Sequence, residues 1–550
     1  MTFSIKPLIL TTLFTIYFIV DSNAQVVYEP TYKTVYGYLS RLAQKGVVDL
    51  DDIVLPLSRA YISNKLDILS YQSGILTPLE KKELDFYRKE YTLERNIEQK
   101  IELETPYTSV FKVQSGDRFR WGAYQDKQFT INAQPIGGYE GEIRNDGVIN
   151  HHTWRGALIY GYIGKSIGFS FDVRDNTEKG DSIDTKKVFT PVTGVIGISS
   201  SPNNFEYSEV RGSISARWKW GSASIGKDFL NWGYGEGGKI VMSQKAPSFP
   251  MIRFDVKPVK WLMFNYQHAW LNSNIIDSTT ITKTLSSGYD QFYYRDKLLA
   301  SHSVTFIPIK GLSVTAGESV IYNNGVKLPF LIPVLFFRLV DHYLGGLQTP
   351  NISNSQIFFQ FSSRNHIRKT HLYLSYFVDE ISLSKLYTDG QVRNQTAYTG
   401  GISVADFLIP NLSFTVEYSK IRPFVYVNRV VAQSYKSSDY YLGHWIGPNA
   451  DQIHGQILYR IARGLSLKGT VEYIRKGEQG SDSLQSGEVS TPFLGGKIDK
   501  FMNISLEARY ELTHDLFFKF GYYSRRKNLT ISSLEEKVHN SFSFGFNYGF

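Results

Sequence analysis

The C-terminal stretch SFSFGFNYGF (541–550) decides the fold class, because small or polar residues alternate in it with aromatic ones. The aromatic positions are Phe542, Phe544, Phe546, Tyr548 and Phe550. Successive side chains of a β-strand point to opposite faces, so this stretch predicts a strand with one aromatic face. A terminal strand of this kind is typical of outer-membrane barrels, whose outer surface is apolar and whose lumen is polar.

The same period of two runs through the chain from about residue 106. Apolar and polar residues alternate over 503–512, 465–473 and 412–419, and each run is about nine or ten residues long. Strands of soluble sandwiches are usually about five or six residues long, whereas a tilted strand needs about nine to eleven residues to cross a bilayer. We therefore predict an all-β transmembrane barrel of the outer-membrane type for residues 106–550.

The connections between these runs alternate in length, which gives a strand count. Short turns are expected near 164–167, 221, 257–260, 308–311, 366–369, 409–411, 462–464 and 513–515. Long polar loops are expected near 140–153, 175–209, 230–250, 271–298, 322–355, 379–396, 420–454, 475–499 and 526–539. This pattern predicts about 18 antiparallel strands, with 16 or 20 as alternatives because of the hairpin-like stretch 118–133. Short periplasmic turns and long outer loops are the known asymmetry of such barrels.

The region before the barrel has two parts. Residues 1–24 carry Lys6, an apolar run over 8–20 and the small residues of Ser22-Asn23-Ala24, a pattern typical of a cleaved signal peptide. Residues 25–105 have helical periodicity, and Thr77-Pro78-Leu79-Glu80 forms a capping box with proline at the first helical position. We expect three short amphipathic helices here, forming a small periplasmic domain.

Composition excludes several classes of protein. The chain has 550 residues and no cysteine, so thiolate metal sites and disulfides are excluded. The net charge of +9 is spread over the chain without a dense Lys/Arg block, so we expect no nucleic-acid partner. The charge instead favours acidic partners such as lipopolysaccharide or an acidic glycan.

Two motifs resemble catalytic or nucleotide sites but lack the necessary context. The pattern G-x-S-x-G at 164–168 lies in a predicted strand–strand turn rather than between a strand and a helix. The pattern G-x-G-x-x-G at 233–238 is not followed by a helix that could hold a pyrophosphate. The histidines show no metal-ligand spacing. We therefore expect no catalytic residue, no cofactor and no metal.

The outer loops combine aromatic and polar residues, the mixture that binds sugars. Aromatic rings cover the apolar face of a pyranose, while amides and charged groups bond to its hydroxyls. The predicted polysaccharide-binding residues are Asn231, Trp232, Tyr234, Tyr440, Tyr441, His444, Trp445, Asn449, Asp451 and Gln452. Ordinary aromatics of the membrane interface are the alternative interpretation of these positions.

The sequence resembles the capsule-assembly Wzi family of outer-membrane proteins over nearly the whole mature chain. The resemblance is carried by an ordered set of segments. They are YGYLSRLAQKGVVDL (36–50), PLSRAYISNKL (56–66), WRGALIYGYIGKSIGFSFDVRD (154–175), KDFLNWGYGEGGKIVMSQKAPSFP (227–250), ASHSVTFIPIKGLSVTAGESVIYNNG (300–325), LYLSYFVDEISL (372–383), EYSKIRPFVYVN (417–428) and YYLGHWIGPNAD (440–451). The resemblance implies an 18-stranded barrel with a periplasmic helical bundle, and a lectin-like role for loops that hold capsular polysaccharide.

We therefore predict a non-enzymatic, monomeric protein of the outer membrane, in contact with its lipid, that binds or organises surface polysaccharide. Two alternatives remain open at this point. The first is a porin or small-solute channel, because a barrel of this size can enclose an aqueous lumen. The second is an outer-membrane hydrolase.

Overall fold

The computed structural model describes residues 26–99, 105–113, 118–164, 166–284, 288–345, 353–380, 394–480, 491–528 and 537–549. The predicted signal peptide, residues 1–24, lies outside these residues. None of the helices in the described ranges is long and apolar enough to cross a membrane.

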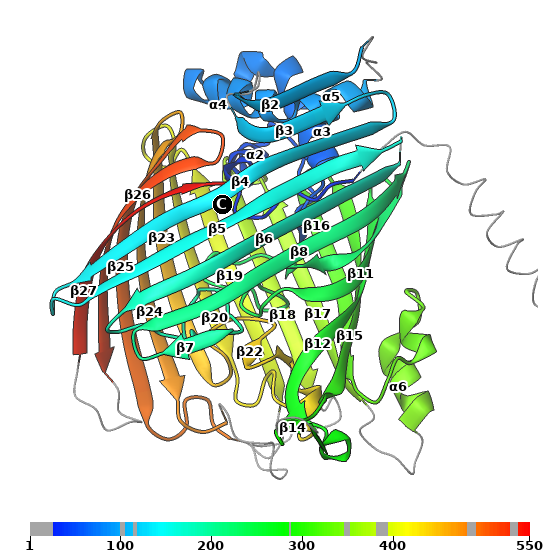
Figure 1. Cartoon of the computed structure of the whole chain (residues 1–550), viewed down its shortest axis with the longest axis vertical. Coiled ribbons are helices and arrows are strands. Elements are labelled where there is room, and N and C mark those ends of the chain that lie inside the picture. The colour runs from blue at the N-terminus through cyan, green and yellow to red at the C-terminus, as the bar shows by residue number, and fades with distance from the viewer. Residues whose placement is uncertain are drawn as a thin grey trace, which may run out of the picture.

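A closed antiparallel ring of 18 strands forms the body of the molecule, as predicted (Figure 1). In ring order they are β4 (Phe129–Arg144), β5 (Ile149–Ile163), β6 (Ile167–Gly180), β8 (Asn204–Trp218), β9 (Gly221–Asp228), β11 (Phe249–Val259), β12 (Leu262–Ile276), β15 (Tyr294–Ile309), β16 (Leu312–Tyr322), β17 (Ser353–Arg364), β18 (Thr370–Glu380), β19 (Gln395–Ala405), β20 (Leu412–Ile421), β23 (Ala450–Ala462), β24 (Leu465–Gly477), β25 (Ile498–Thr513), β26 (Leu516–Asn528) and β27 (Lys537–Tyr548). The ring closes where β27 pairs with β4, from Ser541 opposite Arg144 to Tyr548 opposite Gly137. Closure leaves no strand edge exposed to lipid.

The alternating C-terminal residues behave as their period requires. Phe542, Phe544 and Phe546 are exposed on the outer surface of β27, while Ser541 and Asn547 are buried on the other face. The aromatic face of the last strand thus points toward lipid.

A hairpin precedes the ring and explains the uncertainty in the strand count. It consists of β2 (Tyr107–Val113) and β3 (Phe119–Gln125). Strand β3 pairs only with the first part of β4, from Gln125 opposite Thr130 to Gly122 opposite Ala133. The remainder of that edge of β4 pairs with β27, so the hairpin is added to one end of the ring and is not part of it.

All eight predicted short turns lie at one end of the barrel, including the turn between Ile163 and Ile167 that contains the G-x-S-x-G pattern. One predicted long loop is wrong. Residues 140–153 belong mostly to β4 and β5, which are joined by a four-residue turn over 145–148. The error arises because these two strands are 16 and 15 residues long and continue the polar alternation beyond the length assumed for a membrane crossing.

Four helices of the N-terminal region pack over the end that carries the short turns (Figure 1). They are α2 (Thr34–Gln44), α3 (Arg59–Tyr71), α4 (Pro78–Glu90) and α5 (Thr92–Glu98). Three match the predicted helices, and α5 is an additional short one. The predicted capping box begins α4: the Glu80 backbone N–H donates to Thr77 Oγ1 over 3.3 Å, and the Thr77 N–H donates to Glu80 Oε2 over 2.8 Å.

The connection between β16 and β17 folds back over the outside of the barrel wall. It carries the 3₁₀ turn η3 (Leu328–Leu331) and α6 (Phe337–Gly345), which lies outside the ring (Figure 1). Phe330 and Phe337 pack with Tyr266, Leu298 and Tyr322 of the wall. The Phe337 backbone N–H, at the start of α6, donates to Glu318 Oε1 over 2.5 Å, and His302 lies 3.1 Å from the same oxygen. The Glu318 side chain on the lipid side is thereby covered by the chain itself.

Short elements occupy the remaining connections. They are β1 (Val54–Leu55), η1 (Ser73–Ile75), β7 (Ser199–Ser201), β10 (Asn231–Trp232), η2 (Ser278–Thr280), β13 (Thr282–Lys283), β14 (Asp290–Gln291), η5 (Val431–Gln433), β21 (Lys436–Ser437) and β22 (Tyr440–Tyr441).

Candidate functional site

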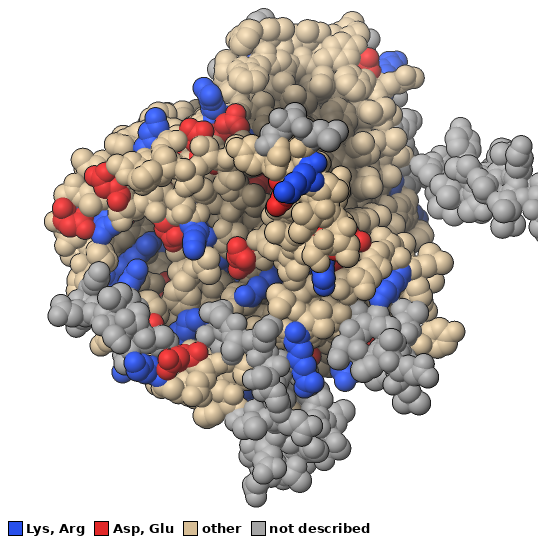
Figure 2. Space-filling view, turned by 60° about the horizontal axis from the view of Figure 1, so that its bottom comes forward, with Lys and Arg blue, Asp and Glu red and all other residues tan. Residues whose placement is uncertain are grey.

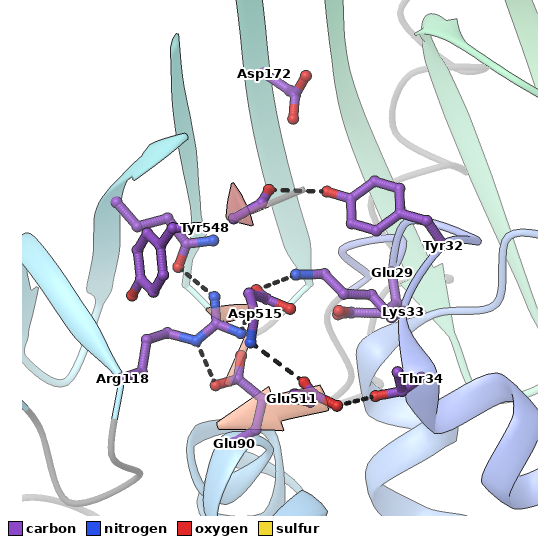
Figure 3. Close-up of polar contacts among 12 residues, drawn as sticks. Glu29, Tyr32, Lys33, Thr34, Glu90, Arg118, Asp172, Glu511, Asp515 and Tyr548 are labelled. Atoms are coloured by element: carbon purple, nitrogen blue, oxygen red, sulfur yellow. Dashed lines mark hydrogen bonds and ion pairs between the residues drawn. The ribbon is translucent and has the colours of Figure 1, made fainter. Parts of the chain in front are cut away.

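A buried group of charged residues joins the helical domain to the end of the barrel with the short turns (Figure 3). We call this group the polar junction; its members are Glu29, Lys33, Arg59, Glu90, Glu94, Arg118 and Asp515. Arg118, just before β3, donates from Nε to Glu90 Oε2 over 2.7 Å and lies 2.6 Å from Asp515 through Nη2. Lys33 forms an ion pair with Asp515 from the opposite side.

The charges of the polar junction compensate one another. Burial alone would raise the pKa of Glu90, but the guanidinium groups of Arg118 and Arg59 outweigh it and hold that pKa well below its usual range. Burial also opposes ionisation of Asp515, and Arg118 and Lys33 again lower its pKa. Both carboxylates are therefore ionised at neutral pH.

Arg59, the first residue of α3, is the centre of the same junction on the helical side. Its guanidinium lies 2.5 Å from Glu29, 2.6 Å from Glu94 and 3.1 Å from Glu90. One arginine thus pairs with carboxylates from three segments: the N-terminal segment, α4 and α5. A buried cation of this kind fixes the relative positions of these segments, since in any other arrangement Glu29 and Glu94 would lose this cation, and Glu90 would keep Arg118 but not Arg59.

Further ion pairs around the barrel rim also attach the helical domain to the barrel. Arg364 at the end of β17 reaches Asp52 over 2.8 Å, and Lys257 reaches Asp51 over 2.7 Å. Arg41 on α2 pairs with Asp406 in the turn between β19 and β20. The helical domain is therefore attached to several separate points on this rim and covers the end of the lumen.

The connection between β9 and β11, residues 229–248, folds into the lumen. Its strand β10 pairs with β1 of the helical domain, with Trp232 opposite Val54 and Asn231 opposite Leu55. The Trp232 ring is 1% exposed and packs edge-on against Phe358 of the wall at 5.7 Å. This connection thus reaches through the barrel to the helical domain.

The glycine-rich stretch 233–238 forms a tight turn on a wall carboxylate rather than a phosphate site. Glu417 of β20 accepts hydrogen bonds from the backbone N–H groups of Glu236 over 2.8 Å and Gly237 over 3.0 Å. Gly235 has a φ of +150°, and a Cβ there would lie 2.1 Å from the Gly238 carbonyl oxygen. Glycine is required because the backbone approaches itself too closely for a side chain.

The connection between β20 and β23, residues 422–449, also folds inward and packs against the first. The Tyr426 hydroxyl donates to the Ile240 carbonyl over 2.6 Å, and Trp445 Nε1 donates to the Gly237 carbonyl over 2.7 Å. We call residues 229–248 and 422–449 together the lumen plug. Its apolar side chains share one core with Phe358 and Phe377 of the wall.

The predicted polysaccharide-binding residues lie mainly in this plug. In the first connection, the Tyr234 hydroxyl donates to Asp52 of the helical domain over 3.1 Å. In the second, Tyr440 donates to the carbonyls of Lys186 and Val195, and Tyr441 packs on Tyr426 at 5.7 Å. His444 is fully buried, and burial lowers its pKa to about 3.

The last three predicted residues lie at the end of the plug and the start of β23, and they bond to β24 and to the connection that follows it. Asn449 accepts a hydrogen bond from the Leu494 N–H over 2.7 Å, Asp451 binds Arg475 through both oxygens, and Gln452 donates to Glu472 over 3.0 Å. The structure thus brings both predicted loops together, but their side chains are engaged by other parts of the chain. Asp451 lies on the lipid face of β23, the face that carries Ile453 and Ile457. Binding of polysaccharide by the predicted residues remains a prediction.

An open cleft lies at the other end of the barrel, among the long loops. It has a volume of about 460 Å³ and is formed by the starts of β11 and β15, the end of β12 and parts of four connections. Its lining combines Phe249, Trp270 and Tyr294 with Asn272 and Lys297. None of these residues was among the predicted binding residues. The predicted loops 230–250 and 271–298 cover Phe249, Asn272, Tyr294 and Lys297, whereas in the structure these residues lie on β11, β12 and β15, whose pairing brings them together.

The surface around this end carries charges of both signs. Figure 2 shows Lys and Arg side chains interspersed with Asp and Glu over the face with the long loops. Within the described ranges, there is no group of three or more His, Asp or Glu side chains that could hold a metal ion.

Comparison with known proteins identifies the family. The profile described as "Capsule assembly protein Wzi" matches residues 156–537, more than half of the chain. The chain belongs to the Wzi family. It is accordingly an outer-membrane β-barrel. No curated protein matches it by sequence.

The fold agrees with that of a solved Wzi structure. Escherichia coli Wzi, described as an outer-membrane carbohydrate-binding β-barrel involved in group 1 capsule assembly, is 13% identical; the match covers 95% of this chain and 99% of that chain, with a TM-score of 0.53. Acinetobacter baumannii OccAB2 is 12% identical, with 76% and 98% coverage and a TM-score of 0.44. Pseudomonas aeruginosa OpdL is 10% identical, with the same coverage and a TM-score of 0.43.

Proposed function

We propose that this Wzi-family barrel is a non-enzymatic protein that holds capsular polysaccharide at the cell surface through its long outer loops. The observation that carries the proposal is the closure of the lumen. The helical domain covers the periplasmic end, and the plug joins that domain to the outer loops through the pairing of Trp232 with Val54. A barrel filled in this way serves as a rigid support for its outer loops.

The plug also argues against the porin alternative. A diffusion channel needs a continuous aqueous path, whereas here the apolar side chains of 229–248 and 422–449 pack directly on the wall. We propose that the predicted residues Trp445 and His444 contribute by fixing the shape of the outer loops from below. Because one chain closes the ring, we also propose that the protein acts as a monomer, surrounded by outer-membrane lipid.

Deletion of the gene tests the proposal. We expect the deletion strain to synthesise its polymer but release it into the medium, and the wild-type gene to restore cell-attached capsule. A strain with Trp445→Ala and His444→Ala should retain less polymer while the protein is still assembled in the outer membrane.

A normal cell-attached capsule in the deletion strain would contradict the proposal. Planar-bilayer recordings of the purified protein provide a second measurement, in which we expect no steady conductance. Steady open channels would instead support a porin.

A further inference from the structure

The outer cleft contains a buried lysine without a counter-ion. Lys297 on β15 is 3% exposed and lines the cleft. It lies opposite Leu271 in the sheet register, and both Leu271 and the next inward residue, Leu299, pack on the core of the lumen plug. The Lys297 side chain therefore points to the interior of the barrel and not to the lipid.

Lys297 forms no hydrogen bond or ion pair with the described residues. The other charged group that acts on it is Lys436, a second cation. A buried lysine in the neighbouring loops shows the usual solution: Lys245 donates to the carbonyls of Lys187 and Val192. Burying a charge without a partner costs free energy. The buried position of Lys297 is explained if a bound anion supplies the partner of its ammonium group.

The other side chains of the cleft match a sugar. Phe249 offers an aromatic surface and Ser438 a hydroxyl. Trp270, Asn272 and Tyr294 belong to the opposite face of β12 and β15 from Lys297 and line the cleft at the rim of the wall, where Arg295 and Asp296 also line it. Aromatic surface with neutral hydrogen-bonding groups is the combination that receives a pyranose ring. The volume of about 460 Å³ falls within the range of small-ligand sites, roughly 300–1,000 Å³.

We propose that this cleft binds a carboxylate-bearing sugar unit of the polysaccharide, with Lys297 as the counter-charge of the carboxylate. The inference rests on the proposed function and names the class of ligand that the outer surface accepts. A carboxylate fits better than a phosphate of lipopolysaccharide, since Lys297 lies on the interior face of the wall whereas lipid headgroups lie outside the ring.

The test uses the purified full-length protein in detergent and two probes of the same length. One probe is tetragalacturonate, and the other is its methyl ester, which keeps the sugar rings but removes the charge. By isothermal titration calorimetry, we expect the acid to bind at least about 10-fold more tightly than the ester, the range of a charge-assisted hydrogen bond.

The variant Lys297→Met should reduce affinity for the acid by about 10-fold or more and leave affinity for the ester unchanged. Lys297→Arg should retain most of the affinity for the acid. The matched control is Lys310→Met, which removes the same charge from an exposed position, with 60% side-chain exposure, at the periplasmic end. It should bind both probes as the wild type does.

Stability provides a check that does not depend on ligand. Since Lys297 has no partner, Lys297→Met without ligand should have a melting temperature equal to or above that of the wild type. A lower melting temperature would show that Lys297 serves the fold and would overturn the inference.

The binding outcomes separate the cleft from the proposed function. Equal binding of acid and ester, or no binding of either, overturns the inference, while shedding of polymer by the deletion strain would still support polysaccharide retention. Inorganic phosphate is added as a competitor. If it displaces the acid probe with similar affinity, the cleft accepts any small anion and the sugar assignment is wrong.

Discussion

Two parts of the barrel interior, the junction with the helical domain and the lumen plug, are closed by different kinds of contact. At the periplasmic end, Arg59 and Arg118 bind carboxylates from four separate parts of the chain. Above it, the lumen plug is closed by packed rings such as Trp232 on Phe358 and Tyr426 on Phe377. Both closures are buried, but only the first depends on the pairing of opposite charges.

This difference has a physical consequence. Apolar packing does not depend on the direction of a contact. A substitution in the plug should therefore lower stability in proportion to the buried apolar surface that it removes. A buried ion network is directional, and loss of one member leaves the others charged in a medium of low dielectric. The polar junction should therefore determine where the helical domain docks, while the plug supplies general stability to the outer loops.

The largest effect is expected when the junction loses its central cation. Arg59→Met keeps a long side chain but leaves Glu29, Glu90 and Glu94 without this partner. Removing one partner of a buried pair costs about 3–5 kcal/mol, and three carboxylates are affected here, so we expect undocking of the helical domain. Limited proteolysis in detergent should cut within residues 26–99 much faster than in the wild type.

The control for Arg59 is Arg217→Met. Arg217 pairs with Glu98 at the same interface, but both side chains are 27% exposed, so the loss should stay below about 1 kcal/mol. If both variants are cut at the same rate, burial of the junction is not what holds the domain.

A smaller but substantial effect is expected in the plug. Trp232→Ala removes a buried ring from the core that joins β10 to the wall, and such truncations cost about 3–5 kcal/mol. We expect lower thermal stability and intermittent conductance in planar bilayers. Trp261→Ala, at a position 51% exposed near the periplasmic turns, serves as the control and should change neither quantity appreciably. Unchanged stability of Trp232→Ala would mean that the plug contributes little to the closure.

The comparison also shows what the sequence could predict. The ring, the eight short turns and the Thr77 capping box depend on local signals: a period of two, turn residues and helix-start residues. These were all predictable because each signal lies within about ten residues of the structure it specifies.

The direction of the loops could not be predicted in this way. The loops around Trp232 and Trp445 have the composition of an exposed sugar site. The burial of these two rings depends on partners distant in sequence, such as Val54 and Gly237. Aromatic residues in a polar loop fit either outcome, since both a glycan and a barrel lumen accept an aromatic ring. Lys297 was missed because it falls in the predicted loop 271–298, whereas in the structure β15 begins at Tyr294, and the inward register of this lysine follows only from that strand.

The smallest expected effect concerns the pH dependence of the plug. Burial lowers the pKa of His444 to about 3, compared with about 6.5 for an unfolded chain. Between these values the unfolded state binds a proton that the folded state does not, so stability is lost as the pH falls from 6.5 toward 3. The loss is about 1.4 kcal/mol per pH unit, or about 2 kcal/mol at pH 5. Glu472 and His454 are the charged or titratable groups that face this ring.

The variant His444→Phe isolates this contribution, because phenylalanine keeps an aromatic ring and binds no proton. Denaturant unfolding followed by tryptophan fluorescence should show a smaller loss of stability between pH 7 and pH 5 for this variant than for the wild type. Other buried histidines, such as His514, titrate in both proteins, and their contribution cancels in the difference. His366→Phe, at an exposed position in the turn between β17 and β18, should keep the wild-type pH dependence. If His444→Phe has that same dependence, His444 is reached by protons in the folded state, and the outer part of the plug is more open to water than its packing indicates.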